Sequence, residues 1–183
     1  ELSFMLETLS KPVIFTGSQL PIGDLRTAAK VNLITSIQIA ALKANGVSSI
    51  TEVGLYFEYK LYRANRTTKI NAEHFEAFAS LNYPALVQSG VHLKVNKNAL
   101  LPVNRRKKLK VHKKMESNIL LVKMFPGLDE TTINHLFNYP QIKGLVLESY
   151  GSGNLTNEPW FLSALKKIIA KDIPVINVTQ CSG

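Results

Sequence analysis

The second half of the chain alternates short apolar runs with amphipathic stretches, and this alternation restricts the fold more than any other feature. The apolar runs are NILLVKMF, GLVLESYG and PVINVTQ, and the amphipathic stretches between them are DETTINHLFN and EPWFLSALKKIIAKD. Continuous apolar runs are typical of strands buried on both faces, and apolar residues at helical spacing predict helices. Strands that alternate with helices form βαβ units, so a mostly parallel sheet is predicted.

The first half of the chain shows a similar order. KPVIFTGSQ and TEVGLYFEYKLY are predicted strands, and LRTAAKVNLITSIQIAALKAN between them is a predicted helix. Asp24 is the expected N-cap of this helix, and Asp129 is the expected N-cap of the first helix in the second half. A basic segment near residues 97–117 separates the two halves. We therefore predict an α/β fold of two three-layer α/β/α blocks with parallel sheets, Rossmann-like or flavodoxin-like, over residues 1–112 and 113–183.

Composition and charge narrow the classes of function. The chain has 183 residues, of which 45% are apolar, so it can bury a substantial core. No apolar run is long enough to cross a bilayer, and the acidic N-terminal segment does not fit a signal peptide. The formal net charge is +9, and residues 105–114, RRKKLKVHKK, carry most of the excess. Such a run is typical of a solvated linker, and a basic nucleic-acid-binding module is the non-enzyme alternative.

Polar segments follow three of the predicted strands, where ligands bind in open α/β sheets. They are TGSQ, with the hydroxyls of Thr16 and Ser18, then YRANRTTK, and then ESYGSGN. Lys69 ends the second segment. A lysine acts as a base only when burial and neighbouring charges hold it beside a proton path, and otherwise it is a solvated loop residue. Thr68 is its neighbour, but adjacent side chains on a strand point to opposite faces.

Other residues in these segments leave two interpretations open. Arg63 and Arg66 have guanidinium groups suited to clamping a carboxylate or a phosphate, or to tying a loop in place. The YGSGN segment is either a tight turn or a set of backbone N–H groups facing an anion. The four histidines show no metal-ligand spacing, and the single cysteine, Cys181, excludes an internal disulfide. A buried structural thiol is the expected state of Cys181.

Five strings together resemble one family. They are SFMLETLSKPVIFTGSQLPIGDLRTAAKVNL, LYRANRTTK, FEAFASLNYPAL, LVLESYGSGN and VINVTQCSG. In collinear order they are similar to the cytoplasmic, type I, bacterial L-asparaginases. The resemblance implies a cytoplasmic homodimer or dimer of dimers that hydrolyses L-asparagine to L-aspartate and ammonia without a metal or cofactor. It also implies that residues 1–112 are part of the larger N-terminal domain and that residues 113–183 begin the smaller C-terminal domain.

The same resemblance assigns roles to particular residues. The family lysine that handles protons beside a second threonine and an aspartate falls on Lys69, and Thr68, Arg66, Thr16 and Ser18 become supporting residues of that site. The family nucleophile lies in a TGGTI-like motif, and the threonine and aspartate lie in an HGTDTM-like motif. Neither motif occurs in these 183 residues. We therefore expect an internal fragment, with both blocks incomplete and with no activity by itself.

Two further points follow from the resemblance. Some type I relatives bind asparagine at a second, allosteric site through an arginine, and Glu148 stands at that position here. A carboxylate does not clamp the substrate carboxylate, so this form of allostery is not expected, although Thr179 and Cys181 are candidates to line the remaining pocket. The alternative enzyme class is the asparaginase-like subunit of glutamyl-tRNA amidotransferase, which shares the fold and the motifs.

Overall fold

The computed structural model describes residues 1–102 and 107–182 and divides the chain into two compact units, Glu1–Lys113 and Lys114–Gly183. The first unit contains three helical segments on or beside its main sheet, α1 (Leu2–Met5), α2 (Ala29–Ala40) and the 3-10 turn η1 (Ala64–Arg66), and a second 3-10 turn, η2 (Lys97–Ala99). Arg105 and Arg106 of the basic run lie outside the described residues.

The main sheet of the first unit has five strands in the order β10-β9-β6-β5-β2. These strands are β2 (Val13–Thr16), β5 (Val53–Phe57), β6 (Lys60–Arg63), β9 (Val87–Ser89) and β10 (Leu93–Val95). Only β2 and β5 are parallel, and the other three pairs are antiparallel. The α/β class is confirmed, but this sheet is mixed and not mostly parallel as expected.

One cause of the difference is a hairpin inside the stretch predicted as a single strand. The segment TEVGLYFEYKLY turns at Glu58 and Tyr59, which have φ angles of 44° and 67°. Phe57 then pairs with Lys60, so β6 returns antiparallel to β5. Both turn residues adopt the left-handed conformation that Gly and Asn usually supply in such turns, so the sequence carries no ordinary turn signal here.

Short two-stranded pairings complete the first unit. They join β1 (Leu6–Glu7) to β11 (Lys110–Val111), β3 (Lys43–Ala44) to β4 (Val47–Ser48), and β7 (Thr68–Lys69) to β8 (Phe78–Ala79). The pairing with β1 means that part of the basic run is a strand and not only a linker. Glu7 contacts His112 at 2.8 Å and Lys110 at 3.7 Å, and these contacts, the hydrogen bond to His112 first, lower the pKa of Glu7.

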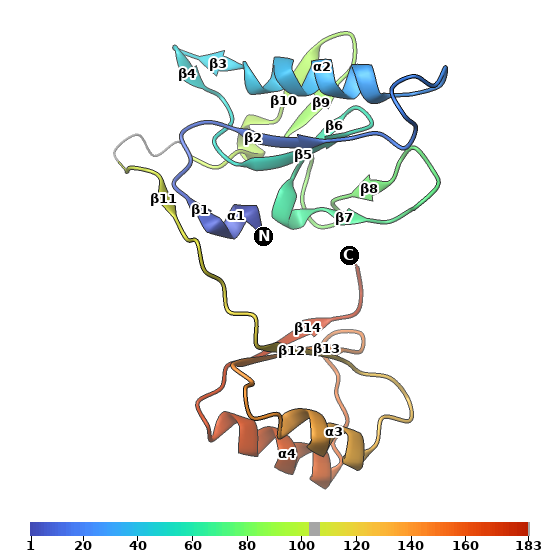
Figure 1. Cartoon of the computed structure of the whole chain (residues 1–183), viewed down its shortest axis with the longest axis vertical. Coiled ribbons are helices and arrows are strands. Elements are labelled where there is room, and N and C mark those ends of the chain that lie inside the picture. The colour runs from blue at the N-terminus through green and yellow to red at the C-terminus, as the bar shows by residue number, and fades with distance from the viewer. Residues whose placement is uncertain (103–106, 183) are drawn as a thin grey trace. The chain divides into compact units, whose positions relative to one another are not determined.

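The second unit is a parallel sheet in the order β12-β13-β14. Its elements are β12 (Ile119–Lys123), α3 (Glu130–Phe137), β13 (Gly144–Ser149), α4 (Pro159–Ile169) and β14 (Val175–Thr179). Both crossovers move along the sheet in one direction, and because such crossovers are right-handed, both helices lie on the same face (Figure 1). Asp129 caps α3 as predicted, since its Oδ1 accepts a 2.7 Å hydrogen bond from the Thr132 N–H.

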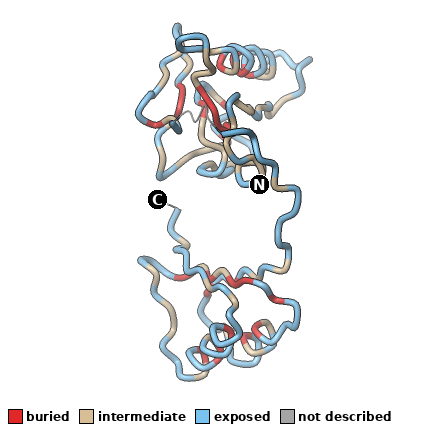
Figure 2. Tube along the Cα trace, turned by 90° about the vertical axis from the view of Figure 1, so that its left-hand side faces the viewer, coloured by how far each residue is buried: buried red, intermediate tan, exposed pale blue. Residues whose placement is uncertain are grey.

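Each unit has its own core (Figure 2). In the first unit, Ile39 of α2 packs with Tyr56 and Leu61 of the main sheet. In the second unit, Phe161 and Ile133 from the two helices pack on Leu147. The other face of the second sheet is not covered by any described helix and exposes Leu121 and Ile176. This unit therefore has two layers within the described residues, where three were expected.

Candidate active site

The loop that follows β2 is held in place by its own polar side chains. Thr16 Oγ1 donates a 3.0 Å hydrogen bond to the Tyr56 carbonyl on the neighbouring strand, and Ser18 Oγ donates a 2.6 Å bond to the Leu20 carbonyl. Gln19 Nε2 donates to the carbonyls of His74 at 2.9 Å and Ala72 at 3.3 Å. The loop after β2 is therefore tied to the loop after β7, the strand on which Lys69 lies.

Lys69 approaches the carboxyl end of β5 by an indirect route. The hairpin places Arg63 opposite Gly54, at the amino end of β5. The sequence had predicted one continuous strand, with the YRANRTTK segment at its carboxyl end. The chain then returns through β7, where Lys69 pairs with Phe78. The centre of the Phe78 ring lies 5.1 Å from the centre of the ring of Phe57, the last residue of β5. Lys69 is exposed, and its Nζ lies 6.0 Å from the centre of the Phe78 ring.

The supporting residues are divided between two places. Thr68 is exposed on β7, where its side chain and that of Lys69 point to opposite faces of the strand. Arg66 lies on η1, with its guanidinium 5.8 Å from the centre of the Tyr83 ring. It lines a hollow of about 380 Å³ together with Thr51 and Glu52, which precede β5. Arg66 therefore belongs to the amino end of β5, while Thr16 and Ser18 lie at and beyond the carboxyl end of β2.

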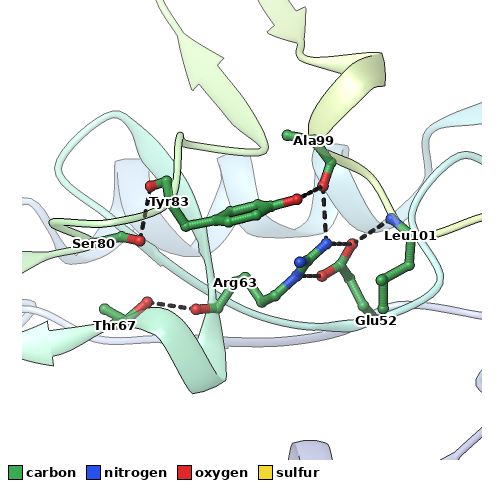
Figure 3. Close-up of polar contacts among 7 residues, drawn as sticks. All are labelled: Glu52, Arg63, Thr67, Ser80, Tyr83, Ala99 and Leu101. Carbon is green, nitrogen blue, oxygen red and sulfur yellow. Dashed lines mark hydrogen bonds and ion pairs between the residues drawn. The ribbon is translucent and has the colours of Figure 1, made fainter. Parts of the chain in front are cut away.

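Arg63 forms a buried ion pair that sequence reasoning missed (Figure 3). Its guanidinium donates two hydrogen bonds to Glu52, whose side chain is only 4% exposed, and a third, of 2.9 Å, to the Ala99 carbonyl. The Leu101 N–H also donates to Glu52 at 3.0 Å. The hydrogen bonds with Glu52 raise the pKa of Arg63, against the opposing effect of burial. Arg63 thus ties a loop in place, which was one of its two open interpretations.

The face of Tyr83 completes this cluster. The Arg63 guanidinium lies 4.3 Å from the centre of the Tyr83 ring, a distance suited to a cation–π contact. The Tyr83 hydroxyl donates a 2.8 Å hydrogen bond to the Ala99 carbonyl, which Arg63 also binds. The only sign of this ion pair in the sequence was an acidic residue, Glu52, directly before an apolar strand. Its partner could be identified only from the hairpin, which places Arg63 beside Glu52.

In the second unit, the residues named for an allosteric pocket do not share one face. Glu148 pairs with Val178 in the parallel register and Ser149 pairs with Thr179, so Glu148 and Thr179 point to opposite faces of the sheet. Thr179 Oγ1 donates to the Gly151 carbonyl and accepts a 3.0 Å bond from the Cys181 N–H. Cys181 is exposed, so the expectation of a buried thiol is wrong.

A glutamine that the sequence analysis passed over joins the strand ends of the second unit. Gln180 Nε2 donates to the carbonyls of Met124 at 2.7 Å and Glu148 at 2.8 Å, and so connects the ends of all three strands. The neighbouring YGSGN segment is a tight turn, because Tyr150 and Asn154 exchange backbone hydrogen bonds across it. Gly151 and Gly153 supply the positive φ angles, 42° and 104°, that this turn requires.

Two absences hold for residues 1–102 and 107–182. No group of three or more His, Cys, Asp or Glu side chains has an arrangement suited to a metal ion. No helix in the same residues combines the length and the apolar character that a membrane span requires.

Several relatives align with nearly the whole of this chain. It is 40% identical to L-asparaginase 1 of Escherichia coli over 98% of the chain and 51% of that protein, and 37% identical to mouse 60 kDa lysophospholipase over 98% of the chain and 31% of that protein. The D subunit of glutamyl-tRNA(Gln) amidotransferase from Methanobrevibacter smithii is 29% identical over 98% of the chain and 41% of its own length. The chain thus spans about half or less of these relatives.

A solved structure agrees with the sequence relatives. L-asparaginase I from Vibrio cholerae superposes with a TM-score of 0.86 at 35% identity, over 98% of this chain and 53% of that one. Residues 1–101 match the family model "Asparaginase, N-terminal", and residues 118–183 match the model "Glutaminase/Asparaginase C-terminal domain". Since the first model alone matches more than half of the chain and the second follows it in order, the chain belongs to the asparaginase family.

Proposed function

We propose that this chain is the part of an L-asparaginase that supplies the proton-handling lysine, Lys69, and that the complete enzyme hydrolyses L-asparagine to L-aspartate and ammonia. The observation that carries the proposal is the attachment of the loop after β2 to the loop after Lys69 through Gln19. This attachment gathers two polar segments that the resemblance to type I asparaginases assigns to one site. The family models over both units support the same assignment.

The proposed reaction proceeds through an acyl-enzyme. A threonine hydroxyl outside these 183 residues attacks the side-chain amide carbon of asparagine, the new C–O bond replaces the C–N bond, and ammonia leaves with the proton of the hydroxyl. Water then cleaves the ester, releases aspartate and restores that proton. Lys69 passes protons to and from the threonine, beside an aspartate that also lies outside these residues. We expect no activity from this chain by itself, because neither the TGGTI-like nor the HGTDTM-like motif occurs in it.

The test is ammonia release from L-asparagine by the complete protein that contains this chain. Lys69→Ala should lower kcat by roughly 10²- to 10⁴-fold, the usual contribution of a general acid or base, with a smaller change in KM. Lys60→Ala is the matched control, since Lys60 is also exposed and lies on β6 of the same unit. A Lys69→Ala enzyme with full kcat would overturn the assignment, and ammonia release by the isolated 183 residues would overturn the expectation of inactivity.

The relative with an amidotransferase name favours one alternative. The D subunit of glutamyl-tRNA(Gln) amidotransferase aligns with 98% of this chain, although at lower identity than L-asparaginase 1. An asparaginase releases ammonia from free L-asparagine without other components. An amidotransferase subunit would instead release it from glutamine in support of transfer to charged tRNA. Comparing the two amides, with and without glutamyl-tRNA, separates the two functions.

The location and assembly that we propose are cytoplasmic and homo-oligomeric, a dimer or a dimer of dimers. Support for assembly comes from α2, which exposes four large apolar residues, Val31, Leu33, Ile34 and Ile37. A helix that is apolar on its outward face normally packs against another surface. Light scattering of the complete protein should give a mass of two or four chains, and a monomer at micromolar concentration would contradict the proposed assembly.

A further inference from the structure

A small hollow that Lys69 does not line lies between the start of α2 and the turn that joins β5 to β6. Its volume is about 290 Å³, and its lining includes Arg26, Asn32, Glu58 and Tyr59, with Phe75 as an aromatic wall. This volume is at the low end for a small-molecule site, so a compact ligand fits the hollow best. The chemistry of such a ligand follows from the charged groups of the lining.

Glu58 supplies an unpaired negative charge. Its Oε1 atom is buried and has no hydrogen-bond partner in the part of the chain that the structure describes. Burial, and secondarily the charge of Glu76, raise the pKa of Glu58, so the ionised form lacks compensation. A buried carboxylate oxygen is stabilised by a donor, above all by a cationic one. Glu58 is therefore suited to an ammonium group.

The conformation of the turn gives a second, independent reason to look here. Glu58 and Tyr59 both have positive φ angles, 44° and 67°, although neither is Gly or Asn. Non-glycine residues in this region are strained, and strained positions occur preferentially at binding and catalytic sites. Both residues of the turn, Glu58 and Tyr59, line the hollow.

Arg26 supplies the opposite charge in the same lining. It is exposed and forms no ion pair with any described residue. Two other polar groups of the lining are already engaged: Asn32 Nδ2 donates a 2.8 Å bond to the Gly17 carbonyl, and Thr27 Oγ1 donates a 2.9 Å bond to the Leu20 carbonyl.

We propose that this hollow binds a free α-amino acid as its zwitterion, with the ammonium group on Glu58, the carboxylate on Arg26 and the side chain against Phe75. Two uncompensated charges of opposite sign, in one hollow with an apolar wall, match the two ends of such a ligand and its side chain. The proposal does not depend on the asparaginase reaction or on Lys69. It also differs from the candidate pocket at Glu148, Thr179 and Cys181, which lies in the other unit.

The first experiment tests the ligand class on the unaltered chain. Calorimetric titration with L-alanine, L-norvaline and L-asparagine should give saturable binding, and backbone amide signals of Glu58, Tyr59 and Phe75 should shift in NMR spectra. Ethylamine and propanoate each carry only one of the two charges, so each should bind at least tenfold more weakly than L-norvaline. The absence of binding by all three amino acids up to about 10 mM, or equal binding by the half-ligands, would overturn the proposal.

The second experiment tests the two charges. Glu58→Gln and Arg26→Gln should each weaken binding about tenfold or more, because each removes a charged hydrogen-bond partner while keeping most of the side-chain volume. Glu73→Gln and Lys30→Gln are the matched controls, since both residues are exposed and neither lines the hollow. Unchanged affinity in both test variants would refute the assignment. Circular dichroism checks the fold, and the half-ligand comparison remains decisive if a variant does not fold.

Discussion

Glu52 and Arg63 form a buried ion pair in the first unit, and its loss should be measurable as lost stability. Arg63→Ala should lower the free energy of unfolding by about 3 kcal/mol, because it leaves the Glu52 carboxylate buried without its cation. Arg63→Lys should recover only part of this loss, since an ammonium group cannot reproduce the two-pronged hydrogen bond. Urea denaturation followed by circular dichroism measures both changes.

Lys110→Ala is the control for that measurement. Lys110 forms an exposed ion pair with Glu7 at 3.7 Å, and exposed pairs contribute little to stability. We therefore expect no measurable change in the urea midpoint. Equal effects of Arg63→Ala and Lys110→Ala would show that burial of the Glu52–Arg63 pair has no energetic consequence, contrary to our interpretation.

Glu58 should make stability depend on pH in a defined direction. Its pKa is raised in the folded chain, chiefly by burial, so the folded state binds a proton more tightly than the unfolded state. The favourable contribution is complete below the usual pKa of a glutamate and is lost as pH rises through the raised value. Glu58→Gln should remove this decrease, as measured by thermal unfolding between about pH 4 and pH 7.

Glu7 acts in the opposite direction, on the acid side of the usual glutamate pKa, and must be separated from Glu58. Its lowered pKa means that its contribution is present above the usual glutamate pKa and is lost as pH falls. The double variant Glu7→Gln, Glu58→Gln should therefore show a flatter pH profile than either single variant. A Glu58→Gln profile identical to that of the unaltered chain would contradict the predicted role of Glu58.

At the scale of elements, the β5–β6 hairpin turns through two consecutive non-glycine residues in the left-handed conformation. Tyr59 has a φ of 67°, a conformation that glycine adopts without penalty. Tyr59→Gly should therefore raise the free energy of unfolding by about 1 kcal/mol. Tyr59→Ala is the matched control, since it removes the same side chain and keeps the penalty. If the alanine variant gains as much as the glycine variant, the side chain and not the backbone is responsible.

Helix starts show how local sequence signals succeed and fail. Asp129 caps α3, as its position before an amphipathic stretch predicted. Asp24 does not cap α2, because α2 begins at Ala29 and its N-cap residue is Ala28; the Ala29 N–H instead donates a 3.1 Å hydrogen bond to Thr27 Oγ1. The intervening residues form turns in which Thr27 binds the Leu20 carbonyl, and this contact across seven residues holds the chain out of the helix.

At the scale of the whole molecule, the two units should unfold separately. Each core cluster draws its residues from one unit only. Leu147→Ala should destabilise the second unit by about 2 to 5 kcal/mol, the usual cost of such a cavity, because Leu147 is 1% exposed. Amide hydrogen exchange should quicken in β12, β13 and β14 and stay unchanged in β5 and β6. Equal acceleration in both units would show a single cooperative unit.

The second unit was the more predictable part of the chain, for a physical reason. Its strands and helices alternate in sequence, and each helix packs beside the strands that it connects, as with Phe161 and Leu147. Periodicity and handedness therefore suffice to derive its parallel order. The first unit has a mixed sheet in part because the chain turns at Glu58 and Tyr59, so that β6 runs antiparallel to β5. This turn contains no Gly, Pro, Asn or Asp, so no local pattern predicted it.

For the candidate site, too, some features followed from the sequence and others only from the tertiary structure. Sequence alone determined the α/β class and the resemblance of five strings to type I asparaginases. It also determined the selection of Lys69, Thr16 and Ser18, which lie in polar segments at the ends of predicted strands. Only the tertiary structure decided which segments meet. Gln19 reaches His74 across 55 residues, and Arg63 reaches Glu52 only because the hairpin register brings their strands together. Such contacts depend on strand pairing and burial, which act between residues distant in sequence and leave no trace in local periodicity.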